Sequence, residues 1–133
     1  QYCLIRVAVI YRGRAIPMIW KVIKHKSSSV AYERYEDLLD TAATLLPASC
    51  DVIFLADRGF ADVDLMNHLK RLEWHWRIRI KGNFWIHRHG HRRRKVKAIP
   101  LASGQARFWH HVYITAQQLG PVHLAVARPS GCR

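Results

Sequence analysis

Acidic residues are missing from almost half of this sequence. All nine Asp and Glu residues lie at or before Glu73, where ten Lys and Arg nearly balance them. From Trp74 to Arg133 the chain has twelve Lys and Arg and no acid. A surface of this kind attracts polyanions, and nucleic acid is the commonest polyanion in the cytosol. The alternative is a solvated basic face without a partner.

Long apolar runs and paired cysteines are also missing. No run is long enough for a membrane span, and the first residues lack the basic-then-apolar order of a signal peptide. Cys3, Cys50 and Cys132 lie far apart without CxxC spacing, which favours reduced thiols over disulfides or a zinc site. We therefore expect a cytosolic or nucleoid-associated protein. Its 133 residues, 50% of them hydrophobic, suffice for one domain, or for one domain and part of another.

The first residues have the pattern of a β-hairpin. Two apolar segments rich in Val and Ile, Cys3 to Tyr11 and Ala15 to Lys24, flank the turn sequence Arg-Gly-Arg. Pro17 has no N–H to donate to a ladder. The second strand should therefore be an edge strand or carry a bulge at this position.

Helices and strands then alternate. We predict an amphipathic helix over about residues 30–46, with the serines at 27–29 as candidate N-caps and Pro47 as its end. A strand follows at 52–56, then a helix capped by Asp62 with an apolar face, and then a strand at 76–81. Residues 84–128 contain β-like pieces separated by Gly, Pro and Ser, and no convincing helix.

Asp57 is the most informative acid. It follows the apolar segment VIFLA directly, and sites in open α/β sheets gather at the carboxyl ends of strands. A carboxylate there suits a divalent metal ion, and Gly59 could accept an unusual turn. The structural alternative is that Asp57 caps the next helix or pairs with Arg58 or another arginine. Spacing alone leaves the two interpretations about equal.

Three sequence blocks carry a resemblance to a known family. YRGRAIPMIWKV, LADRGF and IRIKGNFW occur in this order within residues 2–85. They resemble the middle of the DDE-type transposases of bacterial insertion sequences, in the family that includes the insertion-sequence-four group. The resemblance implies an α/β, ribonuclease-H-like fold with one aspartate on the first strand, one after the fourth, and a glutamate on a late helix. Asp57 matches the second aspartate.

This resemblance also implies a metal-dependent reaction on DNA. Three carboxylates in such enzymes hold two Mg2+ or Mn2+ ions, which activate a water or a 3'-hydroxyl and stabilise the leaving oxygen of a phosphodiester. Asp57 would be a catalytic residue and a metal ligand. The expected partners of the complete protein are double-stranded DNA at the transposon ends and a second copy of the chain, in the bacterial cytoplasm at the nucleoid.

The sequence departs from the family pattern in its acids. No acid precedes Glu33 and none follows Glu73, so the first-strand aspartate and the late glutamate of the family have no counterpart here. We therefore expect an internal segment of a transposase. It would comprise a partial ribonuclease-H-like core over residues 1–83 and the start of a β-rich basic insertion over residues 84–133. In the family the first strand lies between the second and the fourth. The hairpin and the strand at 52–56 should therefore not be direct neighbours, which leaves a gap or exposed edges and an inactive, poorly stable chain.

Candidate DNA contacts gather beyond residue 80. The run HRHGHRRRKVK supplies six Arg and Lys for phosphates. Trp85, just before the run, could stack on a base. Trp109 is a second stacking candidate, although a Trp in such a segment is more often core. The histidines of the run, with His110 and His111, suggest a metal site, but the neighbouring cations argue against zinc. The predicted DNA-binding residues are Lys81, Asn83, Trp85, Arg88, Arg92, Arg93, Arg94, Lys95 and Lys97.

Two classes of function remain open at this point. In the first, the chain is part of a cut-and-paste DNA transposase and Asp57 is catalytic. In the second, it is a noncatalytic basic module that binds nucleic acid, and Asp57 is structural.

Overall fold

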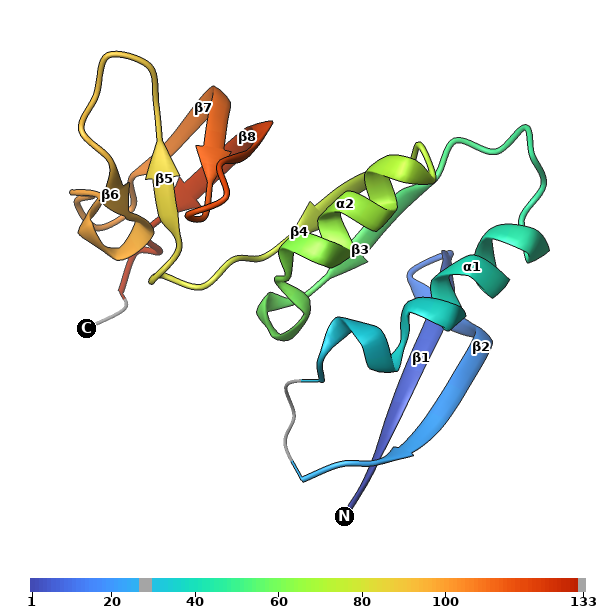
Figure 1. The fold of residues 1–133 in the computed structure, drawn as a ribbon. Coiled ribbons are helices and arrows are strands. Elements are labelled where there is room, and N and C mark those ends of the chain that lie inside the picture. Colours follow the sequence, from blue (N-terminus) through green and yellow to red (C-terminus); the bar gives the residue numbers. More distant parts are fainter. Residues whose placement is uncertain (27–29, 132–133) are drawn as a thin grey trace. The chain divides into compact units, whose positions relative to one another are not determined.

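The computed structural model of the protein describes residues 1–26 and 30–131, which form two compact units (Figure 1). The first unit comprises Gln1–Arg79, and the second begins at Ile80. The serines considered as N-caps lie outside the described residues. Within the described part, no helix has the length and apolar character needed to cross a membrane.

The predicted hairpin is confirmed. β1 (Tyr2–Tyr11) and β2 (Arg14–Lys24) pair in antiparallel orientation. The register shifts beside Pro17, where Met18 is the extra residue of a β-bulge. β2 is also an edge of its two-stranded sheet, so Pro17 has both an edge strand and an adjacent bulge to accommodate it.

The first helix is shorter than predicted. α1 covers Glu36–Leu45, and a separate 3-10 turn, η1 (Tyr32–Arg34), precedes it. Tyr35 between them has φ −138° and ψ 4°, which interrupts the helix. Its ring is buried against that of Tyr32, edge to face with centroids 5.9 Å apart, so core packing overrides the helical pattern here. The helix ends before Leu46, because a proline forces the residue before it out of helical geometry.

The second helix lies between two parallel strands. β3 (Ile53–Ala56) pairs with β4 (His75–Ile78), and α2 (Val63–Arg71) connects them. Asp62 accepts a hydrogen bond from the backbone N–H of Asp64 at 2.7 Å, which confirms the predicted N-cap. β4 begins one residue before the predicted strand and ends three residues earlier.

Apolar side chains from both helices and the hairpin share one core in the first unit. Leu65 and Leu69 of α2 are completely buried, and Ile5 and Ile23 approach them from the hairpin side of the same cluster. Trp74 and Trp76 pack against this cluster, but Trp20, expected from the sequence to pack, is 61% exposed. Trp20 lies on the hairpin face that nothing in the described residues covers.

Polar contacts fix the position of α1. Lys21 donates hydrogen bonds to both carboxylate oxygens of Asp37, at 3.0 and 2.8 Å, which lowers the pKa of Asp37. The buried His68 of α2 lies between the Tyr32 hydroxyl, 2.6 Å from Nδ1, and an Asp40 carboxylate oxygen, 2.7 Å from Nε2. Burial raises the pKa of Tyr32. Because a carboxylate oxygen only accepts, Nε2–H of His68 donates to Asp40.

The two small sheets of the first unit are not joined. β1 pairs only with β2 and β3 only with β4 among the described strands. The expectation that the hairpin and the strand at 52–56 are not direct neighbours is therefore confirmed. Each of these four strands therefore has one unpaired edge among the described strands.

The second unit is a four-stranded antiparallel sheet in the order β6–β5–β7–β8. The short strands are β5 (Trp85–His87) and β6 (Arg94–Lys95), followed by a 3-10 turn, η3 (Val96–Ala98). The long strands are β7 (Ala106–Ile114) and β8 (Leu119–Ala127). Residues 80–131 form no α-helix, as the sequence predicted, and the buried side chains of the sheet are Ile86, Val112, Ile114 and Leu124.

Replacing Leu69 with alanine should destabilise the first unit. The side chain is completely buried, so Leu69→Ala leaves a cavity and should cost about 2–5 kcal/mol of unfolding free energy. Leu55→Ala is the matched control, because Leu55 is 54% exposed and its loss should cost about 0.5 kcal/mol or less. Urea unfolding followed by tryptophan fluorescence measures both. Equal costs would contradict this assignment of the core.

Candidate functional site around Asp57 and the basic sheet

Asp57 follows the last residue of β3, and its side chain is exposed. One carboxylate oxygen accepts a hydrogen bond from the backbone N–H of Gly59 at 2.7 Å, so Asp57 caps the 3-10 turn η2 (Arg58–Phe60). The capping role considered as the alternative is therefore real. Within residues 1–26 and 30–131, Asp57 forms no ion pair with Arg58 or another cation. The bond to Gly59 uses one oxygen and does not require the carboxylate charge.

Gly59 lies within the 3-10 turn η2, and its φ is not in the positive range that favours glycine. The unusual turn that the sequence suggested at this position is absent, because the short helical turn starts directly at the Asp57 cap.

β1 and β3 line one apolar groove of about 960 Å3. Ile53 and Leu55 of β3 are 58% and 54% exposed, although large aliphatic side chains are usually buried. Asp51 lines the groove just before β3, and Asp57 lines it just after that strand. The groove is therefore lined on each side by a strand that has an unpaired edge, and the Asp57 carboxylate lies at the carboxyl end of β3.

Asp57 alone is too little for a divalent metal ion. Mg2+ takes six ligands in octahedral geometry, commonly one or two protein carboxylates with waters and phosphates. In the part of the chain that the structure describes, no three His, Cys, Asp or Glu residues come together to hold a metal ion. These residues fit one ligand of such a site, and not the whole set.

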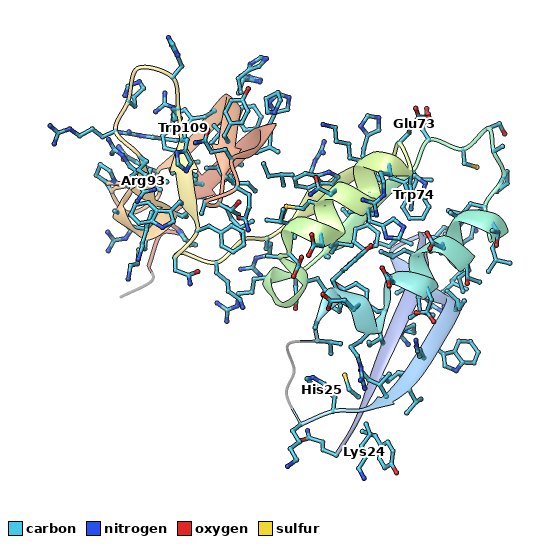
Figure 2. All side chains as sticks on the ribbon, in the orientation of Figure 1. Lys24, His25, Glu73, Trp74, Arg93 and Trp109 are labelled. Carbon is cyan, nitrogen blue, oxygen red and sulfur yellow. The ribbon has the colours of Figure 1, made fainter. Side chains whose placement is uncertain are left out.

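Two indole rings organise the cations of the second unit. The Arg93 guanidinium lies 4.4 Å and the Lys95 ammonium 5.2 Å from the Trp85 ring centroid, and Arg88 lies 4.5 Å from that of Trp109. Figure 2 labels Arg93 and Trp109 among the side chains of this unit. Each cation–ring pair is attractive, because the cation meets the negative face of the ring. Both indoles are half-buried. Their faces are therefore occupied in part by the chain's own cations, which favours phosphate contact over base stacking for this surface.

The remaining predicted DNA contacts are exposed residues in or next to β5 and β6. The backbone N–H of Lys97 donates to the carbonyl of Gly82 at 2.8 Å, which brings Lys97 beside the turn that carries Lys81 and Asn83. Arg92 and Arg94 are exposed at the other end of the same run. The fold thus gathers Lys81, Asn83 and Lys97 in one place, and Trp85 with Arg93 and Lys95 in another.

Sequence reasoning missed two histidine arrangements. The buried contact of His68 with Tyr32 and Asp40 joins residues far apart in the chain. His110 and His123 face each other across β7 and β8, with their Nδ1 atoms 3.2 Å apart. Alternation in VHLAVAR indicates an outward His123, but the pairing register cannot be read from that strand alone. His87 is accounted for, because its Nε2 lies 3.0 Å from the Thr115 carbonyl oxygen.

Comparison with known proteins gives one match. A family model described as the transposase DDE domain matches residues 1–128. No curated protein and no solved structure matches the chain. The match covers almost all of the sequence, including both Asp57 and the basic sheet. The chain belongs to the transposase DDE domain family.

Proposed function

We propose that this chain is the middle of the catalytic region of a cut-and-paste DNA transposase of the insertion-sequence-four group, and that Asp57 is one of its metal-binding carboxylates. The observation that carries the proposal is the position of Asp57, which is exposed at the carboxyl end of β3 and lines the groove between β1 and β3, two strands that each have an unpaired edge. A cap for a 3-10 turn accounts for one of its oxygens only.

The groove supports the view that the catalytic sheet is incomplete in these residues. An extended segment seated there would give hydrogen-bond partners to β1 on one side and to β3 on the other. It would also cover the exposed Ile53 and Leu55. If it ran parallel to β3, its carboxyl end would come to lie beside Asp57, where a second carboxylate is needed.

The residues of this chain then divide the work. Asp57 holds one position of a divalent metal site, and a bound Mg2+ or Mn2+ pair supplies activation of the attacking oxygen and stabilisation of the leaving one. The cations around Trp85 and Trp109 hold the DNA backbone without reading its sequence. Two copies of the complete protein would act on paired transposon ends. The 133 residues alone are inactive in this scheme.

A noncatalytic role is the second candidate. The acid-free second unit, with its cations presented on indole rings, would bind nucleic acid even without a catalytic centre. In that case the function of Asp57 ends with the cap of η2.

Asp57→Asn separates these two roles. The amide oxygen can still accept the hydrogen bond from Gly59, so the fold should keep its stability while the charge that binds metal is lost. In the complete transposase we expect DNA cleavage to fall by at least about a hundredfold, as for loss of a group that acts only on the transition state. Cleavage of end-containing DNA in Mg2+ measures this.

Asp51→Asn is the control for Asp57→Asn. It removes the same charge from the opposite end of β3, in the same groove, and should leave cleavage within about twofold. Full activity of the Asp57→Asn protein would refute the catalytic role. Mg2+-dependent cleavage by the 133-residue chain alone would refute the view that the chain is an incomplete part.

Leu55→Ala tests whether the groove is filled in the complete protein. We expect little cost in the 133-residue chain, because the side chain is exposed there. In the complete chain the same substitution should cost about 2–4 kcal/mol, because a covering strand would bury it. Urea unfolding of both proteins gives the comparison. An equally small cost in both would mean that no segment covers β3.

DNA binding by the basic sheet should be salt-dependent and indifferent to sequence. Removing two exposed cations with Arg92→Ala and Arg94→Ala should reduce the slope of log K against log salt by about 1–2, since each lost phosphate contact removes about 0.9. The matched control removes two exposed cations from the first unit, Arg14 and Lys70. Fluorescence anisotropy with two unrelated duplexes measures the slopes. Equal slopes for the two double variants would contradict this location of the DNA surface.

A further inference from the structure

The outer face of the β7–β8 hairpin differs from the rest of the second unit. Phe108, His110 and Tyr113 of β7 and His123 of β8 are exposed there. Arg107 is opposite Val126 and so belongs to the other face. Within these two strands, the outer face therefore carries histidine and aromatic side chains and no Lys or Arg. In the run HRHGHRRRKVK, neighbouring Lys and Arg would repel a metal cation. The outer face of these two strands has no such neighbours within the strands themselves.

A bulge in β7 brings the histidines together. Trp109 pairs with Leu124 and Val112 with Val122, so two residues of β7, His110 and His111, lie opposite His123 alone. His111 has φ 53°, in the left-handed region, which is typical of a strained bulge position. The bulge turns His110 toward the facing histidine instead of leaving an ordinary cross-strand pair.

The two rings meet through their nitrogens. Nδ1 of His110 and Nδ1 of His123 are 3.2 Å apart, with ring centroids 4.7 Å apart and ring planes at 77°. The Phe108 ring packs edge to face on His110, with ring centroids 4.8 Å apart. Its centroid lies 6.1 Å from that of His123, so Phe108 is next to both rings. Two imidazole nitrogens that bind one tetrahedral ion at bond lengths near 2.05 Å are about 3.3 Å apart. The observed separation of 3.2 Å is close to this tetrahedral distance. It is also within a few tenths of an ångström of the roughly 2.9 Å between cis nitrogens of a square-planar ion such as Cu2+.

We propose that His110 and His123 form a two-histidine site for a late divalent transition metal ion, Cu2+ or Zn2+. Neutral imidazole suits these ions, whereas Mg2+ prefers oxygen ligands, so the site is chemically distinct from that of Asp57. No cluster of three ligating residues occurs in the described part of the chain. Two coordination positions are therefore left to water or to a ligand from solution, which makes the affinity modest and the ion exchangeable.

Titration of the untagged 133-residue chain with Cu2+, followed by calorimetry, tests the proposal. We expect one equivalent to bind in the wild-type chain, and about tenfold weaker binding or more after His110→Ala or His123→Ala, because each removes one of two ligands. The double variant, with both histidines replaced, should lose this binding site. His91→Ala, an exposed histidine outside the pair, is the control and should leave the first equivalent unchanged.

Electron paramagnetic resonance of the Cu2+-loaded wild-type chain gives a second readout that needs no variant. Hyperfine structure from two equivalent imidazole nitrogens supports the pair, as does its loss in His123→Ala. Binding that is unchanged in both pair variants, or lost equally in His91→Ala, would overturn the proposal. A wild-type spectrum with one nitrogen, or with none, would overturn it as well.

Discussion

The unpaired edges of β1 and β3 are the constraint on which the first unit depends. A strand edge presents backbone N–H and C=O groups that must find partners in protein or water. Here two edges border one apolar groove, and β3 leaves Ile53 and Leu55 exposed along it. α1 and α2 bury apolar side chains in the core around Leu65 and Leu69. They do not cover Ile53 and Leu55, which stay exposed. Asp57 follows the last residue of β3 and lines the same groove, so its carboxylate lies at the end of a strand with an unpaired edge.

Local chemistry predicts much of this fold, and tertiary packing accounts for what the sequence pattern misses. Turn residues, β-branched runs and an Asp62 cap are short-range signals, and the hairpin and α2 follow from them. The break at Tyr35 depends on two tyrosines being buried together, which periodicity does not register. Trp20 is exposed because its face of the hairpin has no cover in the described residues, although a tryptophan is ordinarily a core residue.

The candidate site was predictable to the extent that it depends on strand ends and charge. Asp57 at the end of an apolar strand could be identified from the sequence, as could the acid-free segment beyond Glu73. The cation–π contacts of Trp85 could not, because they require the register of β5 with β6. The facing pair of His110 and His123 depends on a bulge, which shifts the alternation by one residue and has no signature in the sequence.

The distribution of charge connects the two units chemically. Every Asp and Glu of the chain belongs to the first unit, and the charged side chains of the second unit are Lys and Arg, together with its histidines. The acids and cations of the first unit nearly balance, whereas the second unit has cations and no acid, so a polyanion is attracted mainly to the second unit. Asp57 can therefore hold a metal ion only if further ligands reach it from outside the second unit. The groove beside β3 is where the described residues leave room for them.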